Sequence, residues 1–400
     1  MDRTPSITRR DALKFAAAGG AAAVALPGHA RAVEDVLRNI RIARLEFIEL
    51  EFPGTLPLKW NAIRSYGGGP PTDSILEVHT DQGIVGRSRP KAPREVIEGE
   101  AFSRLEGQNL LEPERLWDRM YRYNRKSIAK GIYIKAMGSL DVAIWDIIGQ
   151  ALDLPVHRIL GTFRTRIPVY AAGGYYAERK GIRDLVREME GYVDEGFSVV
   201  KMKVAGAPLS EDVERVAAVR KALGDDVGIM LDANNGLKAY EAIRLGRALE
   251  EYRPYWFEEP VMPDDFAGCA EVRQALDMPI VAGENEFTRW GARDLVQAGS
   301  ADILNLDVVK AGGITEYRKI AALASAFHIP VAPHGTVHMS MQTMASVDNG
   351  LIMEVYPSAR SHFNPSLPAV PVEDGHTTVP ERPGLGLEFD EDMIRRYRVR

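Results

Sequence analysis

The stretch from Lys201 to Glu284 carries charged residues at the ends of four short apolar runs. The runs read KMKVAG, MLDANNG, WFEEP and VAGENEF, and the acids Asp232, Glu258 and Glu284 follow one another in steps of 26 residues. A step of that length accommodates one strand, one helix and two loops. Strand ends of a parallel barrel meet at one rim, and three carboxylates together suit a divalent cation with oxygen ligands. The spacing therefore predicts a repeated β/α unit with a metal site at the strand ends.

Composition places the chain among ordinary globular proteins. It has 400 residues, of which 45% are hydrophobic and 26% charged, and a formal net charge of −6. That length suits one large or two moderate domains with a substantial core, and the acidic balance gives no reason to expect nucleic acid as a partner. Cys269 is the only cysteine, which excludes an intrachain disulfide and a cysteine zinc cluster.

Residues 1–32 predict a cleaved signal peptide of the twin-arginine kind. The arginine pair at 9–10 precedes a run rich in Ala, Gly and Val, and ARA at 30–32 has the small residues of a cleavage site. The alternative is an N-terminal membrane anchor, but the apolar run 15–27 is too short and too rich in Ala and Gly to span a bilayer. We therefore expect a periplasmic protein, exported by the twin-arginine route, with no membrane association after cleavage.

Residues 38–160 predict an α+β module, because strand patterns precede helical ones. Apolar and polar residues alternate over 40–51, as in a half-buried strand. The stretch 74–88 predicts a hairpin with its turn at 81–83. Helices are expected over 94–107, 112–126 and 135–152.

Residues 161–360 alternate regularly between apolar runs and amphipathic stretches. Eight runs predict strands, at 167–173, 198–204, 227–233, 255–259, 279–285, 302–309, 330–335 and 351–357. Eight strands with helices between them favour a β/α barrel over an open doubly wound sheet. No G-x-G-x-x-G follows a strand and no G-x-x-x-x-G-K-[ST] occurs, so neither dinucleotide nor nucleoside triphosphate binding is indicated. The Pro-rich segment 361–400 is expected to pack back on the first module.

Ionisable or polar residues stand at nearly every predicted strand end. In a β/α barrel these ends face the active site. Any one such residue could be explained as a solvated loop residue, but that explanation fits poorly when nearly every strand contributes one. The candidates are Lys201, Lys203, Asp232, Asn234, Glu258, Glu259, Glu284, Asp307, His334 and Glu354.

Lys201 and Lys203 are two residues apart on one predicted strand, so their side chains point to the same face. Two adjacent ammonium groups repel each other, and a nearby divalent cation adds to the repulsion, so the pKa of at least one lysine is expected to fall. Such a lysine can act as a base near neutral pH. The alternative is an exposed surface strand, which the apolar residues around both lysines disfavour.

His334 and Asp307 end two adjacent predicted strands, close enough for the carboxylate to hold the imidazole. Such a pair fixes the histidine tautomer and raises its basicity. A satisfied structural histidine is the alternative. His338 forms H-x-x-x-H with His334, but no cysteine and no H-E-x-x-H accompany it, which argues against zinc.

Six motifs occur in a fixed order: KMK (201–203), DAN (232–234), EEP (258–260), GEN (283–285), D-x-x-x-x-GG (307–313) and PHG (333–335). Their order and spacing together resemble the enolase superfamily, in its mandelate racemase branch, over about residues 40–390. The resemblance implies a modified TIM-type (β/α)7β barrel with an N-terminal α+β capping domain. The domains then expected are the signal peptide (1–32), the cap (38–160), the barrel (161–360) and a C-terminal segment packed on the cap (361–400).

The resemblance also implies roles for single residues. One Mg²⁺ per site would be held by Asp232, Glu258 and Glu284, with Glu259 a neighbour rather than a ligand. Catalytic roles would fall to Lys201, Lys203, Asp307, His334 and Glu354, the last as the acid that hydrogen-bonds the enolate oxygen, and Asn234 would contact the substrate. The family often forms symmetric assemblies, so a homo-oligomer is expected.

Asp307 separates two branches of the family. In the muconate-lactonizing and dipeptide-epimerase branch a second catalytic lysine occupies this place on the sixth strand. The pair of Asp307 and His334 is similar instead to mandelate racemase and the acid-sugar dehydratases. Lys310 lies three residues later and is interpreted as a supporting residue.

The constellation predicts removal of a proton next to a carboxylate, through an enediolate. Mg²⁺ bound to the substrate carboxylate would stabilise the charge that develops. Lys203 and His334 come from opposite sides of the barrel and can address opposite faces of the same carbon. One would abstract the proton, while the other would return a proton (racemisation) or help to expel a β-hydroxyl (dehydration).

The cap supplies the residues expected to select the substrate, a small-molecule carboxylate. The stretches 53–72 and 87–94 carry Lys59, Trp60, Asn61, Arg64, Tyr66, Arg87, Arg89 and Lys91, of which Lys59, Arg64, Tyr66 and Arg89 are the substrate-binding candidates. Solvent-facing charges are the alternative for some of them. Their polarity favours an acid-sugar dehydratase, with a racemase or epimerase of a polar α-hydroxy acid or amino-acid derivative as the second possibility. A periplasmic binding protein is the third, disfavoured by the unlike halves of the chain.

Overall fold

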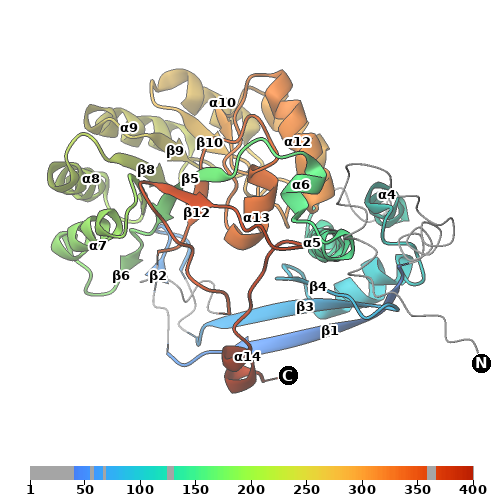
Figure 1. Cartoon of the computed structure of the whole chain (residues 1–400). Coiled ribbons are helices and arrows are strands. Elements are labelled where there is room, and N and C mark those ends of the chain that lie inside the picture. Colours follow the sequence, from blue (N-terminus) through green and yellow to red (C-terminus); the bar gives the residue numbers. More distant parts are fainter. Residues whose placement is uncertain (1–39, 55–57, 66–68, 124–129, 358–365, 400) are drawn as a thin grey trace, which may run out of the picture.

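The computed structural model describes residues 40–54, 58–65, 69–123, 130–357 and 366–399. The predicted signal peptide lies outside the described residues and stays a prediction. The described part forms a cap and a barrel that face each other (Figure 1). None of the described helices is both long and apolar enough to cross a membrane.

The cap is a three-stranded antiparallel sheet, ordered β1-β3-β4, covered on one side by helices. Its alternating sequence explains the sheet, because one face is buried by a helix and the other is partly exposed. Its elements are β1 (Ile42–Glu51), β2 (Leu58–Lys59), β3 (Thr72–Thr80), β4 (Val85–Ser88), α3 (Arg94–Val96), the π-helix η1 (Ile97–Ala101), the 3-10 helix η2 (Phe102–Arg104), α4 (Pro113–Tyr123), α5 (Ile132–Leu152) and α6 (Val156–Leu160).

The barrel is a parallel sheet in the order β11-β10-β9-β8-β7-β5-β12, wrapped by helices. Parallel bridges from Leu304 to Val331 and from Val331 to Gly350 close the remaining gap of the ring. The elements are β5 (Arg166–Ala172), β6 (Tyr176–Ala177), α7 (Ile182–Asp194), β7 (Val199–Lys203), α8 (Leu209–Leu223), β8 (Gly228–Asp232), α9 (Ala239–Leu249), the 3-10 helix η3 (Glu250–Tyr252), β9 (Trp256–Glu258), α10 (Phe266–Ala275), β10 (Ile280–Ala282), α11 (Thr288–Gln297), β11 (Ile303–Leu304), α12 (Ile314–Ala326), α13 (Val337–Met344) and β12 (Met353–Val355).

The predicted fold class, a TIM-type barrel with an N-terminal α+β cap, is confirmed. Seven of the eight predicted barrel strands are strands in the structure, although β11 has only two residues. The exception is 330–335, which contributes only the bridging residue Val331. Pro330 and Pro333 explain this difference, because proline cannot donate to a β-ladder.

Side chains from successive strands fill the barrel interior in one layer. Large residues such as Tyr170 and Trp256 pack edge to face, with ring centroids 5.3 Å apart. Val281, Ile303 and Ala332 complete the layer from the other side. The barrel is therefore a solid core, and its chemistry is confined to the rim above this layer.

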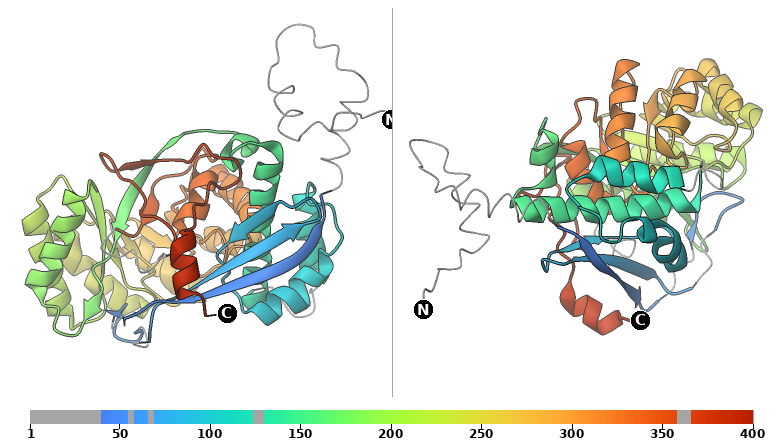
Figure 2. Two further views of the ribbon diagram at one scale, coloured as in Figure 1. Left: turned by 60° about the horizontal axis from the view of Figure 1, so that its bottom comes forward. Right: turned by 90° about the vertical axis from the view of Figure 1, so that its right-hand side faces the viewer.

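Helix α5 lies between the cap sheet and the barrel (Figure 2). It contacts β3 and β4 on one side and α12 on the other. Gly138 allows the closest approach, because a Cβ atom at this position would lie 2.0 Å from the carbonyl oxygen of Val309. The helix thus packs directly on the backbone of the loop that follows β11.

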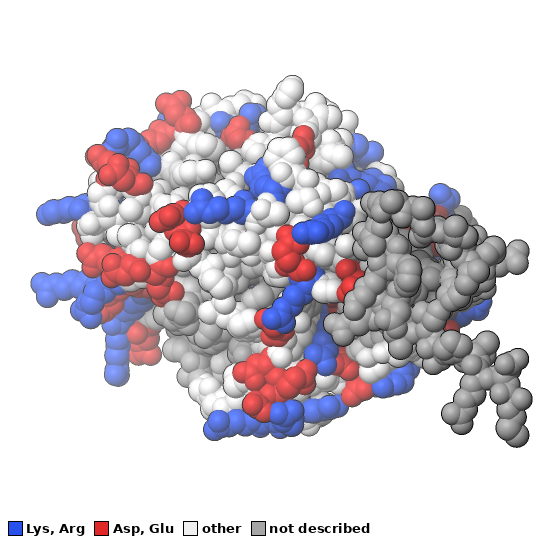
Figure 3. All heavy atoms as spheres, in the orientation of Figure 1, with Lys and Arg blue, Asp and Glu red and all other residues white. Residues whose placement is uncertain are grey.

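The C-terminal segment contacts first the barrel and then the cap. It contains β13 (His376–Thr378), which pairs with β5, and α14 (Glu391–Tyr397), which lies below β1 in Figure 1. Phe389 and Ile394 pack with Leu50 of β1 in a small separate core, and the amide of Val399 donates to the carbonyl of Glu49. Lysine, arginine and acidic side chains are interspersed over the face of the molecule drawn in Figure 3.

Substitution of Gly138 tests how tightly α5 is packed. Gly138→Ala should lower the free energy of unfolding by about 1–3 kcal/mol, because overpacking displaces the helix or the loop. Gly191 is the matched control: it also lies inside a helix, α7, but has no atom within 4 Å of the added Cβ. Gly191→Ala should raise the free energy of unfolding by up to about 1 kcal/mol through helix propensity. Urea denaturation measures both, and an unchanged Gly138→Ala would mean that α5 can shift freely.

Candidate active site at the barrel mouth

Lys201 stands at the centre of the barrel mouth, surrounded by acids. Its ammonium group lies 2.9 Å from Glu258 Oε1, 2.9 Å from Glu354 Oε1 and 3.6 Å from Asp232 Oδ2. The residue is 1% exposed. Burial alone would lower the pKa of Lys201, but the charges of Glu258 and Glu354 outweigh burial and raise the pKa well above its usual value. Lys201 is therefore a fixed cation and a hydrogen-bond donor.

Lys203 lies on the same face of β7 and donates to Asp232 Oδ2 at 2.6 Å. The strand register explains the pair, because Lys203 stands directly opposite Asp232 of β8, which in turn stands opposite Glu258 of β9. Burial would lower the pKa of Lys203, but the negative charge of Asp232 outweighs it and the pKa is raised. The expectation that mutual repulsion lowers a lysine pKa is thus wrong for this structure, because each ammonium group has its own carboxylate.

Glu258 and Glu259 are adjacent, and the structure separates them. Glu258 points into the barrel, where it accepts hydrogen bonds from Trp256 Nε1 at 3.0 Å and Asn305 Nδ2 at 3.0 Å. Glu259 has a left-handed backbone conformation, with φ of 44°, and accepts from Asn285 Nδ2 at 2.7 Å. Only Glu258 of the two thus contacts Lys201.

Both carboxyl groups hold protons more tightly than usual. Burial, with the charges of Asp232 and Glu284, raises the pKa of Glu258 to about 8 against the opposing effect of Lys201. Burial and the charge of Glu284 raise the pKa of Glu259 well above its usual value. The mouth thus contains more buried carboxylate than its lysines compensate, which favours the entry of a further cation.

Glu284 follows β10 and faces His334. Its Oε2 lies 3.2 Å from His334 Nε2 and its Oε1 lies 3.6 Å from Lys310 Nζ. Burial would raise the pKa of Glu284, but the charges of His334 and Lys310 lower it to about 2. Although buried, Glu284 Oε2 accepts no hydrogen bond from the described residues. An ionised, incompletely satisfied carboxylate oxygen is available as a cation ligand at this position.

Asp307 connects His334 to the cap. Its Oδ1 accepts from the amides of Val309 and Lys310, each at 2.9 Å. Its Oδ2 lies 3.4 Å from His334 Nδ1 and also accepts from Lys91 Nζ. Burial would raise the pKa of Asp307, but Lys91 and His334 hold it below the usual range. Asp307 is therefore an ionised residue that orients the histidine, as expected, and also binds a lysine of the cap.

Glu354 of β12 is likewise ionised. It accepts from the amide of Gly335 at 2.6 Å in addition to its contact with Lys201. Burial would raise the pKa of Glu354, but the charges of Lys201 and His334 lower it to about 2. In this state Glu354 is a hydrogen-bond acceptor only.

The loop after β1 is fixed over the barrel mouth by Asn61. The Asn61 side chain donates to the carbonyls of Ala233 and Asn234, at 2.8 and 2.9 Å, and accepts from the amide of Arg64 at 2.8 Å. The carbonyl Oδ1 of Asn234 is buried without a hydrogen-bond partner among the described residues. Asn234 therefore offers an unpaired buried acceptor at the end of β8, and its expected contact with the substrate stays a prediction.

The four predicted substrate-binding residues of the cap fall into different places. The Arg64 guanidinium lies 5.4 Å above the ring of Trp60. Lys59 is exposed on β2, whereas Arg89 forms an ion pair with Asp73 inside the cap at 2.7 Å. Tyr66 lies outside the described residues.

Sequence reasoning gives no chemical role to two residues that the structure brings to the mouth. Lys91 is only one cap cation among several in the sequence, yet it reaches Asp307, 216 positions away. Asn305 links two acids, because its Oδ1 accepts from the amide of Glu284 at 3.0 Å while its amide donates to Glu258. Asn305 carries a usable signal, since it is a polar residue inside the sixth predicted strand, two positions before Asp307.

The donor chemistry of Asp232, Glu258 and Glu284 fits a hard divalent cation. All three are buried carboxylates that follow neighbouring strands, and oxygen ligands of this kind suit such ions. Among the described residues, one group of three possible ligands has all its ligand atoms within 4.8 Å of one another, and it is a different group. The ligand atoms of Asp232, Glu258 and Glu284 therefore lie farther apart than this. The ammonium group of Lys203 contacts Asp232, and that of Lys201 contacts Glu258.

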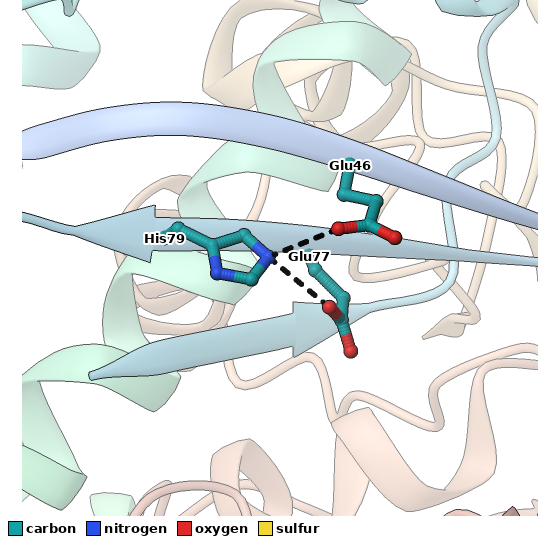
Figure 4. Close-up of side chains that lie close together, drawn as sticks. All are labelled: Glu46, Glu77 and His79. Carbon is teal, nitrogen blue, oxygen red and sulfur yellow. Dashed lines mark hydrogen bonds and ion pairs between the residues drawn. The ribbon is translucent and has the colours of Figure 1, made fainter. Parts of the chain in front are cut away.

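The group that meets the criterion is Glu46, Glu77 and His79 on the cap sheet (Figure 4). His79 Nε2 lies 3.1 Å from Glu77 and 3.7 Å from Glu46. Both acids already have arginine partners: Arg87 at 2.8 Å from Glu77, and Arg44 at 2.9 Å from Glu46. The cluster is thus a compensated ion-pair network, and its charges give no reason to invoke a metal.

Comparisons with known proteins agree with this site. The family described as enolase C-terminal domain-like matches residues 184–393. Arabinonate dehydratase of Saccharolobus solfataricus is 32% identical over 72% of this chain and 78% of its own. D-galactarolactone cycloisomerase of Agrobacterium fabrum is 32% identical over 81% of this chain and 91% of its own.

A solved structure gives the same result for the fold. A racemase from Streptomyces coelicolor with bound magnesium superposes with a TM-score of 0.82 at 28% identity, covering 90% of this chain and all of the racemase. The match extends over both the cap and the barrel. The chain therefore belongs to the enolase superfamily, in the mandelate racemase and muconate lactonizing enzyme family.

Proposed function

We propose that the protein is a Mg²⁺-dependent acid-sugar dehydratase, which removes the α-proton of a polyhydroxylated carboxylic acid and expels the β-hydroxyl as water. The observation that carries the proposal is the pair of proton-transfer groups at one mouth, Lys203 on β7 and the Asp307–His334 pair. His334 follows the bridging residue Val331, and around the ring β12 and β5 lie between Val331 and β7. The two groups therefore come from different sides of the mouth. The similarity to arabinonate dehydratase supports the substrate class.

Asp232, Glu258 and Glu284 would hold the Mg²⁺. The similarity to a racemase with bound magnesium and the excess of buried carboxylate both support this assignment. When bound, Mg²⁺ supplies a Lewis acid that stabilises negative charge on the substrate carboxylate. A cation at this position would also provide part of the charge compensation that Lys201 and Lys203 now give to the acids.

The chain's own residues provide the remaining steps. Lys203 or His334 takes the α-proton, and the enediolate oxygen receives a hydrogen bond from the Lys201 ammonium. His334, oriented by Asp307, would protonate the departing hydroxyl. Asn61 holds its loop over the strand ends near Asn234, where the loop would limit the access of water.

Racemisation or epimerisation is the second candidate. The two groups on separate strands that suit dehydration also suit proton removal on one face and proton return on the other. The similarity to the racemase from Streptomyces coelicolor supports this second reaction. The two reactions are distinguished by their products.

The first prediction concerns product and metal. Incubation of the Mg²⁺-loaded protein with a library of aldonic and aldaric acids should yield a 2-keto-3-deoxy acid from at least one, detected with semicarbazide. EDTA should abolish the reaction and added Mg²⁺ should restore it. Exchange of the α-proton in D₂O without keto acid would favour the racemase, and neither exchange nor keto acid across the library would contradict the proposal.

The second prediction separates the base from the acid. Lys203→Ala and His334→Ala should each slow keto-acid formation by about 100-fold or more, the size of a general acid or base contribution. The variant that still exchanges the α-proton in D₂O, measured by NMR, has lost the acid; the variant without exchange has lost the base. Thermal unfolding controls for folding, and near wild-type turnover by both variants would refute the scheme.

The third prediction assigns the ligand among two adjacent acids. Glu258→Gln should weaken Mg²⁺ binding by more than the roughly 10- to 100-fold seen when an outer partner of a ligand is lost. Glu259→Gln is the matched control and should bind Mg²⁺ nearly as wild type does, because Glu259 pairs with Asn285. Calorimetry measures both affinities, and a loss confined to Glu259→Gln would reverse the assignment.

A further inference from the structure

Ser139 links the backbones of two cap lysines, Lys91 and Lys135, beside the barrel mouth. Ser139 of α5 donates its hydroxyl to the carbonyl of Lys135 at 2.7 Å and accepts from the amide of Lys91 at 3.2 Å. The loop 88–93 is also fixed by Ser88, whose hydroxyl donates to the carbonyl of Ser139 at 2.8 Å. The backbones at Lys91 and Lys135 therefore form one rigid support for two ammonium groups.

The two ammonium groups are poorly compensated. Lys91 contacts Asp307, but it shares that carboxylate oxygen with His334. Lys135 has no acidic partner among the described residues; its ammonium group lies 5.9 Å from the ring of Phe287. Burial and then the positive charges of Lys310 and Lys91 lower the pKa of Lys135. On the cap side of the mouth, the two ammonium groups therefore have Asp307 as their one contacting acid among the described residues, away from the acids around Lys201.

Arg64 adds a third cation from a different part of the cap. Asn61 fixes its loop to the end of β8, and the guanidinium rests on Trp60 without an acidic partner in the described part of the chain. Its charge acts on the same neighbourhood, because Arg64 contributes to lowering the pKa of Lys135. Three cap cations thus lie over the catalytic strand ends: Arg64 on the loop fixed to the end of β8, Lys91 at Asp307, and Lys135 on α5 beside Lys91.

We propose that Lys91, Lys135 and Arg64 form a subsite for a second anionic group of the substrate, a terminal carboxylate. The substrate is then a polyhydroxylated diacid, an aldaric acid. This inference rests on the proposed function for the position of the first carboxylate at the barrel acids. The cap subsite has its own residues, none of which is assigned to proton transfer or to the metal.

The physical reason is charge compensation. Clustering three cations costs free energy, which a bound carboxylate offsets through charge-assisted hydrogen bonds. An aldonic acid of the same configuration presents a neutral CH₂OH group at this end and leaves the cations uncompensated. Arginine and lysine together also suit a planar carboxylate, because arginine can bind both of its oxygens.

The test compares six-carbon aldaric acids with aldonic acids of the same configuration. Binding is measured by calorimetry on Mg²⁺-loaded His334→Ala protein, which binds without turning over, and kcat/KM is measured on protein with His334 intact. Wild type should favour the diacid by about 10-fold or more, as expected for charge-assisted contacts. Lys135→Met should reduce diacid affinity by about 10-fold and leave monoacid affinity nearly unchanged.

Two further variants complete the design. Arg64→Met should reduce the diacid preference as Lys135→Met does. Neither side chain touches a catalytic group, so the change should be confined to the diacid. Lys221→Met is the matched control, since Lys221 is an exposed lysine of the outer helix α8, and should change neither substrate. High salt should weaken diacid binding more than monoacid binding.

The outcomes separate the two proposals. Equal affinity for diacid and monoacid, or an equal loss of both in Lys135→Met, would overturn the subsite even if dehydration occurs. Diacid-selective binding that Lys135→Met abolishes would support the subsite even if no acid sugar is dehydrated, in which case the proposed reaction fails alone.

Discussion

The ammonium group of Lys201 is the interaction on which the barrel mouth depends. Strand ends deliver acids to one small buried region, and buried carboxylates without counter-charge are strongly unfavourable. Lys201 lies within 3.6 Å of oxygen atoms from three of them. It keeps Glu354 ionised and limits the rise in the pKa of Glu258. Positions around the rim are thus set by charge balance as much as by packing.

The cap contributes to this balance from above. Trp117 donates to the carbonyl of Gly312 at 2.8 Å, and the amide of Thr315 donates to Asp141 at 2.9 Å. Both contacts fix the segment that follows Asp307, while Lys91 binds Asp307 itself. The orientation of His334 therefore depends on residues of the cap as well as on its own strand. The catalytic geometry is a joint property of the two domains.

Periodic features of this chain can be predicted from its sequence, and the others cannot. Strand ends repeat with the β/α unit, so the spacing alone places Asp232, Glu258 and Glu284 on one rim. Lys91 cannot be placed in this way, because nothing in its local sequence shows that the loop 88–93 turns toward β11. The lysine pKa values cannot be predicted either, since repulsion between Lys201 and Lys203 is visible in sequence while the distances to their acids are not. The seventh strand is a different case, because two prolines in 330–335 are sufficient reason to expect less than a full strand.

The close contact between α5 and the loop after β11 bears on how such chains can be recombined. Gly138 meets the backbone at Val309, and Asp141 fills the space beside Gly313, where a Cβ atom would lie 2.3 Å from its carboxylate. A chimera that exchanged the whole cap for that of a relative would replace both partners of this loop. The natural unit of exchange is therefore smaller: the loops 58–65 and 88–93 together with the side chain at Lys135, with the rest of α5 retained by the barrel. The boundary between the part of the chain that carries the chemistry and the part that sets substrate specificity therefore lies within the cap, and not between the cap and the barrel.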